Sequence, residues 1–397
     1  MQLKTVLKFA LASVVAGLLG LGSAHAQDTI KIGVVGPKTG PLAGGAAVTH
    51  FPNFDLWASD VNKRGGLKLK TGQKKVELIV YDDKTNPGET IKAVERLATQ
   101  DKADFIFAPY GTGFNLAAAP TFAKHGYPQF AVAAVTDQID ELIKKYPTIY
   151  FWIGDTTSYA RSVAEILKKL VDEKKIGNKV AMVNVADAFG IELANAARPV
   201  FTKAGFELVY DKSYPLGTQD LAPVVKAAKA ANPDSFVAWS YPPDSFGLAE
   251  QAKIEGLSVK AYYSAVATAF PAFGAKFGKS AEGILGAGGI QNTPAIQDYR
   301  KRHKEVTGVD ADYWGSAIYY AALQVLEQAI EGVGSTDRKA VNDYIKSRTF
   351  QTIAGTIDQR KQSNPWFWTV GQWKDGVFHG VKGVNTKDAD VSLKAGW

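Results

Sequence analysis

Two patterns of hydrophobic and polar residues alternate along the chain, one with a period of two and one with a period of three to four residues. Period-two or uniformly apolar runs predict strands near residues 29–35, 76–81, 104–108, 129–134, 179–185, 207–210 and 235–240. Between them, apolar residues recur three and four positions apart, which predicts helices, the longest over about 315–332. Strands that alternate with helices form parallel sheets covered on both faces. The pattern predicts an α/β protein with two doubly wound parallel-sheet lobes.

The C-terminal region breaks this alternation. Aromatic-rich runs at 366–370 and 377–379 flank Lys374-Asp375-Gly376. Asp-Gly between two such runs is a strong signal for a tight antiparallel hairpin. The sequence therefore predicts a β-hairpin with its turn at Asp375-Gly376.

The N-terminus has the features of an export signal. Lys4 and Lys8 precede an apolar run from Phe9 to about Leu21, and Ala24-His25-Ala26 follows. The apolar run is shorter than the roughly 18–20 residues that span a bilayer. We expect residues 1–26 to be a cleaved signal peptide and the mature protein to be periplasmic.

Composition limits the remaining choices. A chain of 397 residues exceeds the size of a single core, so two domains are expected. The net charge of +7 is spread among acidic residues without a run of five like charges, so a nucleic-acid partner is not expected. The sequence contains no cysteine, which removes disulfides, thiol nucleophiles and cysteine-bound metals.

The loop after the strand at 104–108 is the best candidate for a binding site. Ligands of doubly wound sheets lie beyond the carboxyl ends of the strands, where helices begin. Gly111-Thr112-Gly113 can expose backbone N–H groups and a hydroxyl to a small anion such as a carboxylate. The alternative is that Thr112 only caps the following helix.

Three other strand-end loops carry candidate ligand contacts. The strand that ends at Ala133-Ala134 is followed by Thr136, which either caps a helix or points at the same crevice. In the second half, Phe189 and Tyr241 each follow a strand, where an aromatic ring can grip a small amphipathic ligand. Packing against neighbouring helices is the alternative for both rings.

Signatures of catalysis are sparse. The five histidines have no ligand-like spacing, and neither a G-x-S-x-G elbow nor an H-E-x-x-H motif occurs. Asp82-Asp83 could serve acid–base chemistry, but a turn and capping role before Pro87 is the stronger interpretation. We therefore predict a protein that is not an enzyme and that holds neither cofactor nor metal.

Three ordered motifs resemble a known family. Thr39-Gly40-Pro41-Leu42-Ala43, the segment Val61–Gly66 and Tyr81-Asp82-Asp83 are similar to blocks of the Leu/Ile/Val-binding type of periplasmic solute-binding protein, which serves ABC transporters. The resemblance implies two lobes joined by a three-strand hinge and closing on a ligand. It places one lobe at 27–152 and 286–356, and the other at 153–285 and 357–397.

The resemblance also implies ligand contacts. Thr112 matches the residue that holds the ligand carboxylate, and Gly113 adjoins it. Thr136 roughly matches a residue that touches carboxylate and amine, although a one-residue shift around Val135 blurs the match, and Ala134 on the other side of Val135 is a further candidate contact. Phe189 and Tyr241 match aromatic contacts from the second lobe and the loop after Trp239.

Two departures affect the expected ligand. A ring common in the first loop is replaced around Gly44-Gly45, which should widen the pocket. Amino-acid binders place an acidic residue near Val266, and the segment Ser264–Thr268 has none. A buried ammonium without a carboxylate is costly, so an aromatic or aliphatic acid or an amide competes with an amino acid.

The sequence thus predicts a monomeric solute-binding protein. By default its ligand is an amino acid of the branched-chain type, delivered to an inner-membrane ABC permease. A ligand sensor and a periplasmic hydrolase on a similar fold are the alternatives from other classes.

Overall fold

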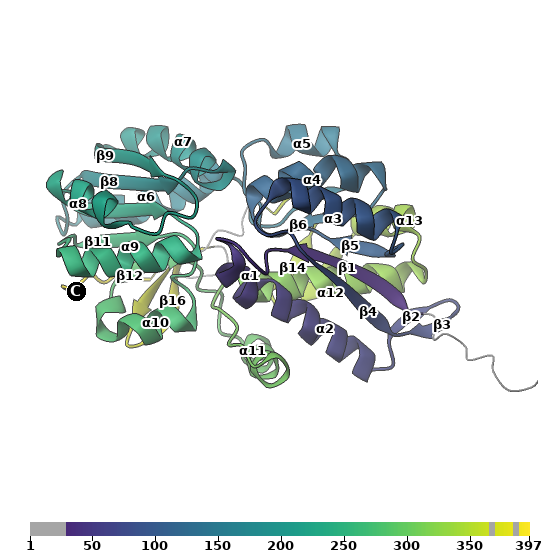
Figure 1. Cartoon of the computed structure of the whole chain (residues 1–397). Coiled ribbons are helices and arrows are strands. Elements are labelled where there is room, and N and C mark those ends of the chain that lie inside the picture. Colours follow the sequence, from purple (N-terminus) through teal and green to yellow (C-terminus); the bar gives the residue numbers. More distant parts are fainter. Residues whose placement is uncertain (1–28, 365–369, 384–388) are drawn as a thin grey trace, which may run out of the picture.

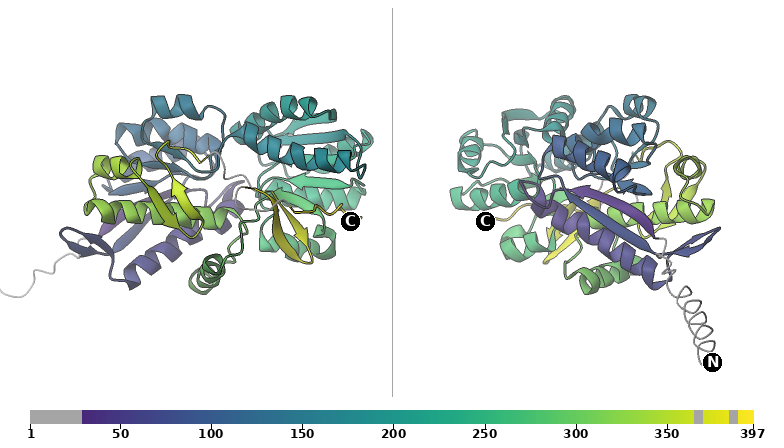
Figure 2. Two further views of the ribbon diagram at one scale, coloured as in Figure 1. Left: turned by 180° about the vertical axis from the view of Figure 1, so that it is seen from behind. Right: turned by 45° about the vertical axis from the view of Figure 1, so that its right-hand side comes forward.

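The computed structural model describes residues 29–364, 370–383 and 389–397. The predicted signal peptide and the aromatic residues 366–368 lie outside these ranges. The chain forms two α/β lobes side by side (Figure 1). Seen from behind, the green and yellow segments from late in the sequence lie in both lobes (Figure 2). The lobes are therefore not simple N-terminal and C-terminal halves.

The first lobe is built on parallel strands. In its main sheet β1 (Ile30–Gly36) lies between β4 (Val76–Asp82) and β5 (Phe105–Phe107), and β6 (Gln129–Ala131) pairs with β7 (Ile149–Phe151). Its helices are α1 (Ala43–Thr49), α2 (Phe51–Lys63), α3 (Pro87–Thr99), α4 (Thr112–Lys124), α5 (Ile139–Lys145), α11 (Pro294–Thr307), α12 (Gly315–Val333) and α13 (Arg338–Ile345). Two hairpins complete the lobe, β2 (Leu67–Leu69) with β3 (Gly72–Lys74) and β13 (Thr349–Thr352) with β14 (Gly355–Asp358).

The second lobe contains a seven-stranded sheet of order β16-β15-β12-β11-β10-β8-β9. Its strands are β8 (Lys179–Val185), β9 (Glu207–Tyr214), β10 (Ser235–Trp239), β11 (Ala261–Ser264), β12 (Ile284–Ala287), β15 (Val370–Lys374) and β16 (Val377–Lys382). Its helices are α6 (Thr156–Asp172), α7 (Ala188–Lys203), α8 (Ala222–Ala230), α9 (Pro242–Glu255) and α10 (Pro271–Phe277). The strands from β8 to β12 are parallel, which confirms the predicted fold class.

The predicted hairpin is present at the edge of this sheet. Trp373 pairs with Phe378 across the turn, and β15 joins β12 in antiparallel orientation. Asp375 and Gly376 have φ angles of 52° and 74°. Positive φ at both central residues is what a type I′ turn requires, and Asp-Gly supplies it at low cost.

Three chain segments cross between the lobes. They connect β7 to α6, β12 to α11 and β14 to β15, and the last includes residues outside the described ranges. The exact lobe boundaries proposed from the sequence stay a prediction. Each of the three segments joins an element of one lobe to an element of the other, as a three-strand hinge requires.

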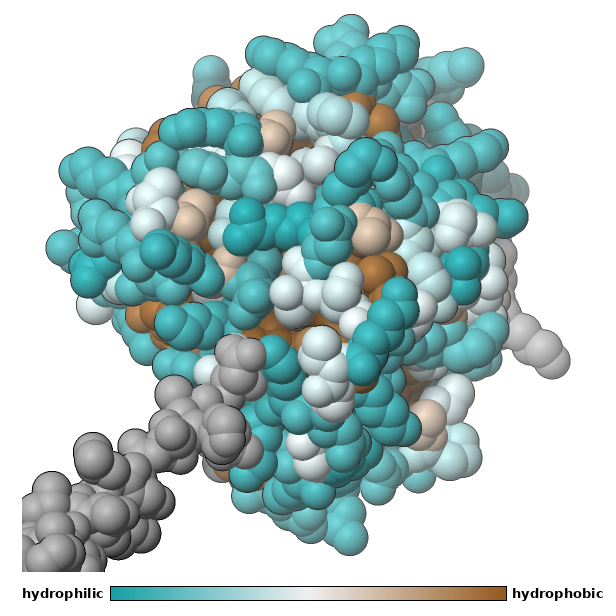
Figure 3. Space-filling view, turned by 90° about the vertical axis from the view of Figure 1, so that its right-hand side faces the viewer, coloured by the Kyte–Doolittle hydropathy of each residue, from teal (hydrophilic) through white to brown (hydrophobic). Residues whose placement is uncertain are grey.

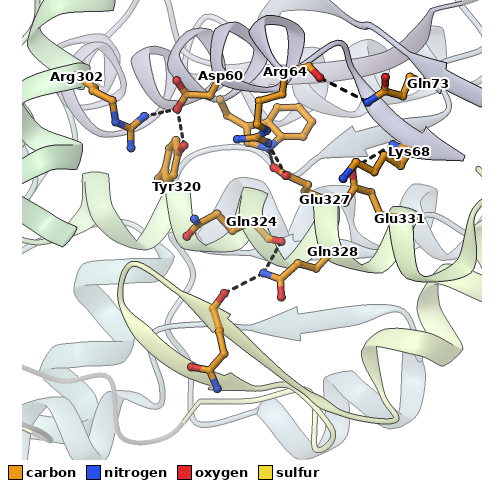
Figure 4. A network of polar contacts seen from close by, with 12 residues as sticks. Asp60, Arg64, Lys68, Gln73, Arg302, Tyr320, Gln324, Glu327, Gln328 and Glu331 are labelled. Carbon is orange, nitrogen blue, oxygen red and sulfur yellow. Dashed lines mark hydrogen bonds and ion pairs between the residues drawn. The ribbon is translucent and has the colours of Figure 1, made fainter.

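A polar network fastens α11 and α12 to α2 in the first lobe (Figure 4). The Asp60 carboxylate pairs with Arg302 of α11 and accepts a hydrogen bond of 2.6 Å from the Tyr320 hydroxyl of α12. Glu327 of α12 accepts a hydrogen bond of 2.9 Å from the Trp57 indole. Because these groups are largely buried, the network fixes the position of α12, whose N-terminus reaches the space between the lobes.

One face of the molecule can be followed in a space-filling view (Figure 3). The end of the first lobe is mainly hydrophilic, with hydrophobic residues scattered among the polar ones (Figure 3). Within the described parts of the chain, we find no helix that is both long and apolar enough to cross a membrane.

Candidate functional site

A cavity lies between the two lobes, beyond the carboxyl ends of their strands. It has a volume of about 40 Å³, enough for a few water molecules at roughly 10–15 Å³ each. Most of its lining atoms are apolar or aromatic. The first lobe contributes Thr49, Tyr110, Gly111, Val132, Ala133, Trp314, Gly315, Ile318 and Tyr319, the second lobe contributes Phe189, Tyr241 and Val266, and Ile153 lies in the first crossing segment.

The lobes are in contact around this cavity, so the structure shows a closed arrangement. Helix α1 contacts α9, and α4 contacts α7. A Cβ atom added at Gly113 would lie 3.5 Å from the Cβ of Ala188 on the opposite lobe. A solute much larger than a few waters therefore requires the lobes to lie further apart than they do in this structure.

Four helices begin at the cavity, and three of these N-termini already face a carboxylate of the chain. Asp187 accepts a hydrogen bond of 3.0 Å from the Gly190 N–H of α7. Asp244 in the first turn of α9 accepts one of 3.3 Å from the Tyr241 N–H. Asp312 accepts bonds from the Trp314 and Ser316 N–H groups at the start of α12. These carboxylates offset the positive ends of their helix dipoles.

Helix α4 is the exception. Gly111 is its N-cap residue, no side chain caps it, and its first turn has no acidic residue. Among the described residues we find no acceptor for the backbone N–H groups of Thr112, Gly113 and Phe114. Gly111 lines the cavity. Free N–H groups and an uncompensated dipole make this the place where an anionic group of a ligand is best stabilised.

Thr112 lies in the first turn of α4, but its hydroxyl is turned away from these N–H groups. The Oγ atom accepts a hydrogen bond of 3.1 Å from the Val135 N–H, and the side chain is fully buried. The hydroxyl therefore joins the start of α4 to the loop after β6. It neither caps the helix nor appears in the cavity lining.

The other predicted contact in this loop is displaced by one residue in a similar way. Ala134 packs in a small core with Ile149 and Phe151, whereas its neighbour Ala133 lines the cavity. In these two loops the cavity is thus lined by Gly111 and Ala133. Their neighbours Thr112 and Ala134 are buried and contact the first lobe instead.

Thr136 lies at the boundary between the lobes. Its Oγ atom accepts a hydrogen bond of 3.1 Å from the Gln138 N–H at the start of α5. It also interacts with Glu192 of α7, whose pKa burial raises and this hydrogen bond lowers. Next to it, the Asp137 carboxylate accepts hydrogen bonds from Thr157 at the start of α6. This loop therefore helps to join the lobes.

Phe189 and Tyr241 both line the cavity from the second lobe. Their rings stack with centroids 4.8 Å apart and an angle of 26° between the planes. The Tyr241 hydroxyl donates a hydrogen bond of 2.9 Å to the Asp187 carboxylate. Burial raises the pKa of Asp187, and burial together with Asp187 raises that of Tyr241. The Tyr241 hydroxyl and the Asp187 carboxylate are thus hydrogen-bonded to each other, and Asp187 itself does not line the cavity.

The widening expected at Gly44-Gly45 stays a prediction, and neither glycine lines the cavity. A Cβ atom at Gly45 would lie 2.6 Å from the Tyr110 hydroxyl oxygen and 2.8 Å from Cγ of Pro242 on the second lobe. A Cβ atom at Gly44, by contrast, would meet no atom within 4 Å. Gly45 therefore permits the close approach of Tyr110 and Pro242.

The sequence analysis missed the contribution of α12. Trp314, Ile318 and Tyr319 form one wall of the cavity, about 200 residues along the chain from Gly111. The sequence predicted a helix over about 315–332 but gave it no part in the site. The sequence signal for this wall is the group of aromatic residues at the start of α12. A single sequence does not show that these residues lie next to the other loops.

Asp82 and Asp83 stabilise turns, as the stronger interpretation predicted. Asp82 accepts hydrogen bonds from the Lys38 and Thr39 backbones. Asp83 is buried, which raises its pKa to about 6, and it accepts bonds from the Thr85 N–H and the Thr90 hydroxyl. In the described part of the chain, no group of three or more histidine and acidic side chains could hold a metal ion.

We expect the substitution Thr112→Val to lower the free energy of unfolding by about 1–3 kcal/mol, because it leaves the buried Val135 N–H without an acceptor. Urea unfolding measures this change. Thr99→Val at the exposed end of α3 is the control and should change stability by less than about 0.5 kcal/mol. Unchanged stability together with a large loss of solute affinity would instead return the Thr112 hydroxyl to the ligand.

Comparisons with known proteins show what the whole chain resembles. A family model described as "Periplasmic binding protein" matches residues 29–376. The curated "Leu/Ile/Val-binding protein homolog 7" of Brucella suis biovar 1 (strain 1330) is 26% identical over 394 residues, covering 93% of this chain and 95% of the relative.

Solved structures share the fold at lower identity. A substrate-binding protein LivJ from Streptococcus pneumoniae in complex with isoleucine has a TM-score of 0.74 at 20% identity, covering 89% of this chain and 99% of that one. A solute-binding protein from R. palustris in complex with benzoate has a TM-score of 0.75 at 17% identity, covering 93% and 97%.

Proposed function

Because the chain belongs to the periplasmic binding protein family, we propose that it captures a small carboxylate-bearing solute in the periplasm and delivers it to an inner-membrane ABC permease. It is a solute-binding protein of the branched-chain amino-acid transporter type. The proposal adds the class of solute, the delivery step, export through cleavage after Ala26, and action as a monomer without chemical conversion of the solute.

The observation that carries the proposal is the uncapped N-terminus of α4, whose N-cap residue Gly111 lines an aromatic cavity. The N–H groups after Gly111 would hold the carboxylate. Phe189 and Tyr241 would cover the rest of the solute from the second lobe. Thr112, Gly113, Ala134 and Thr136 would then act mainly by shaping the two loops of the first lobe.

The cavity lining favours an acid without an α-ammonium group. It contains no aspartate or glutamate, and the nearby Asp187 already binds the Tyr241 hydroxyl. The benzoate complex of the R. palustris relative supports an aromatic acid. A branched-chain amino acid is the second candidate, supported by the relative's name and by the isoleucine complex.

Solute-dependent closure tests the proposed function. A thermal-shift screen over amino acids, aromatic acids and amides selects the solute, because a ligand of the native state raises stability by mass action. We expect this solute to lower the radius of gyration in X-ray scattering, as the lobes close around the cavity. The variant Phe189→Ala removes one ring from the cavity lining, so it should reduce both the thermal shift and the change in the radius of gyration. A stabilising solute that leaves the scattering curve unchanged would contradict closure.

A further inference from the structure

A second and larger cavity lies at the hinge. Its volume is about 210 Å³, against about 40 Å³ for the cavity described above. We call it the hinge cavity. It is bounded by the crossing segment 289–292, by α11 and the start of α12, and by residues 377–380 of β16.

The walls of the hinge cavity come from both lobes. Helix α11 belongs to the first lobe, where it packs on α2 and is held by the Arg302–Asp60 pair (Figure 4). Strand β16 belongs to the sheet of the second lobe. Between them, the Gly289 and Ile290 N–H groups bond to the Tyr313 carbonyl. A change in the angle between the lobes must therefore change the shape of this cavity.

Arg300 supplies an available cation in the hinge cavity. Its guanidinium carbon lies 3.7 Å from the centroid of the Tyr313 ring, so the group is held over the ring face. Within the described ranges, Arg300 forms neither a hydrogen bond nor an ion pair with another side chain. A guanidinium whose N–H donors are free and whose orientation is fixed is well suited to bidentate binding of a carboxylate.

Asp312 is the acidic group that faces Arg300, and its oxygens are already engaged. They accept hydrogen bonds from the Trp314 N–H and from both the N–H and the hydroxyl of Ser316. Asp312 attenuates the charge of Arg300 without using its donors. The rest of the wall includes apolar surface from Ile290, Ile296 and Phe378.

From these contacts we infer that the hinge cavity is a second binding site, and that it takes a small organic carboxylate with a short apolar body. The carboxylate binds the Arg300 guanidinium, and the apolar body contacts the wall formed by Ile290, Ile296 and Phe378. Because such a ligand touches both lobes in the closed arrangement, it stabilises closure and strengthens solute binding between the lobes.

Ligand-observed NMR on the full mature chain tests this inference, with isobutyrate as the probe and the neutral isobutyramide as its isostere. Arg300→Gln removes the cation. Arg348→Gln is the matched control, because Arg348 also stacks on a tyrosine, 3.5 Å from the Tyr344 ring centroid, but lies outside the cavity. Thermal melting confirms that each variant is folded.

We expect isobutyrate to bind the wild type and Arg348→Gln equally. Binding to Arg300→Gln should be weaker by about tenfold or more, the loss expected for hydrogen bonds to a charged group. Isobutyramide should bind the wild type more weakly than isobutyrate. Equal isobutyrate binding by all three proteins would place the probe elsewhere, including the cavity between the lobes, and would overturn the inference, as would no binding at all.

Discussion

Replacing Gly111 by alanine is expected to weaken solute binding by tenfold or more. Gly111 has φ 101° and ψ 148°, a region that is essentially restricted to glycine. A Cβ atom there would lie 3.1 Å from Cδ2 of Phe114 and 3.4 Å from the Tyr241 hydroxyl oxygen. Strain of this kind costs of the order of 1–3 kcal/mol. Its relief must move the N–H groups that are proposed to hold the carboxylate.

Gly113→Ala is the matched control for this variant. Gly113 lies in the same turn, its φ is not positive, and the added Cβ would make an ordinary contact of 3.5 Å with Ala188. Titration calorimetry with the solute from the screen should show a large loss of affinity for Gly111→Ala and a small one for Gly113→Ala. A Gly111→Ala protein that is less stable but binds normally would move the carboxylate site away from α4.

Leucine is expected to bind more weakly than 4-methylpentanoate, its deaminated analogue, by at least about tenfold. The two compounds differ only in the ammonium group. The cavity lining has no carboxylate to pair with that group, and an unpaired buried charge costs several kcal/mol. Competition binding measures the ratio directly, and benzoate in the same assay tests whether the stacked Phe189 and Tyr241 rings favour a planar acid.

The opposite ranking would restore the amino-acid interpretation. If leucine bound at micromolar concentration and 4-methylpentanoate gave no response, a carboxylate must reach the ammonium group. Asp187, which lies behind Tyr241, is a candidate for this group. Asp187→Asn should then abolish leucine binding, whereas under the acid hypothesis it should change the affinity for 4-methylpentanoate only slightly.

The sequence pattern by itself determined most of the regular structure. Strand β8 and the start of α12 lie where periodicity predicted them, and the Asp375-Gly376 turn has the two positive φ angles its residue types favour. These features depend on local preferences and on the burial of one face, which a sequence displays directly. Short strands such as β7 and β12 were not predicted, because three or four apolar residues carry little periodic signal.

Only the tertiary structure decided which side chains form the binding site. At the strand ends the chain leaves regular geometry, so the direction of each side chain depends on single backbone angles such as the positive φ of Gly111. That is why Gly111 and Ala133 line the cavity while Thr112 and Ala134 face inward. The Trp314 wall and the close approach of Pro242 to Gly45 depend on contacts between distant segments. Such contacts are fixed by the packing of the two lobes, which local pattern does not encode.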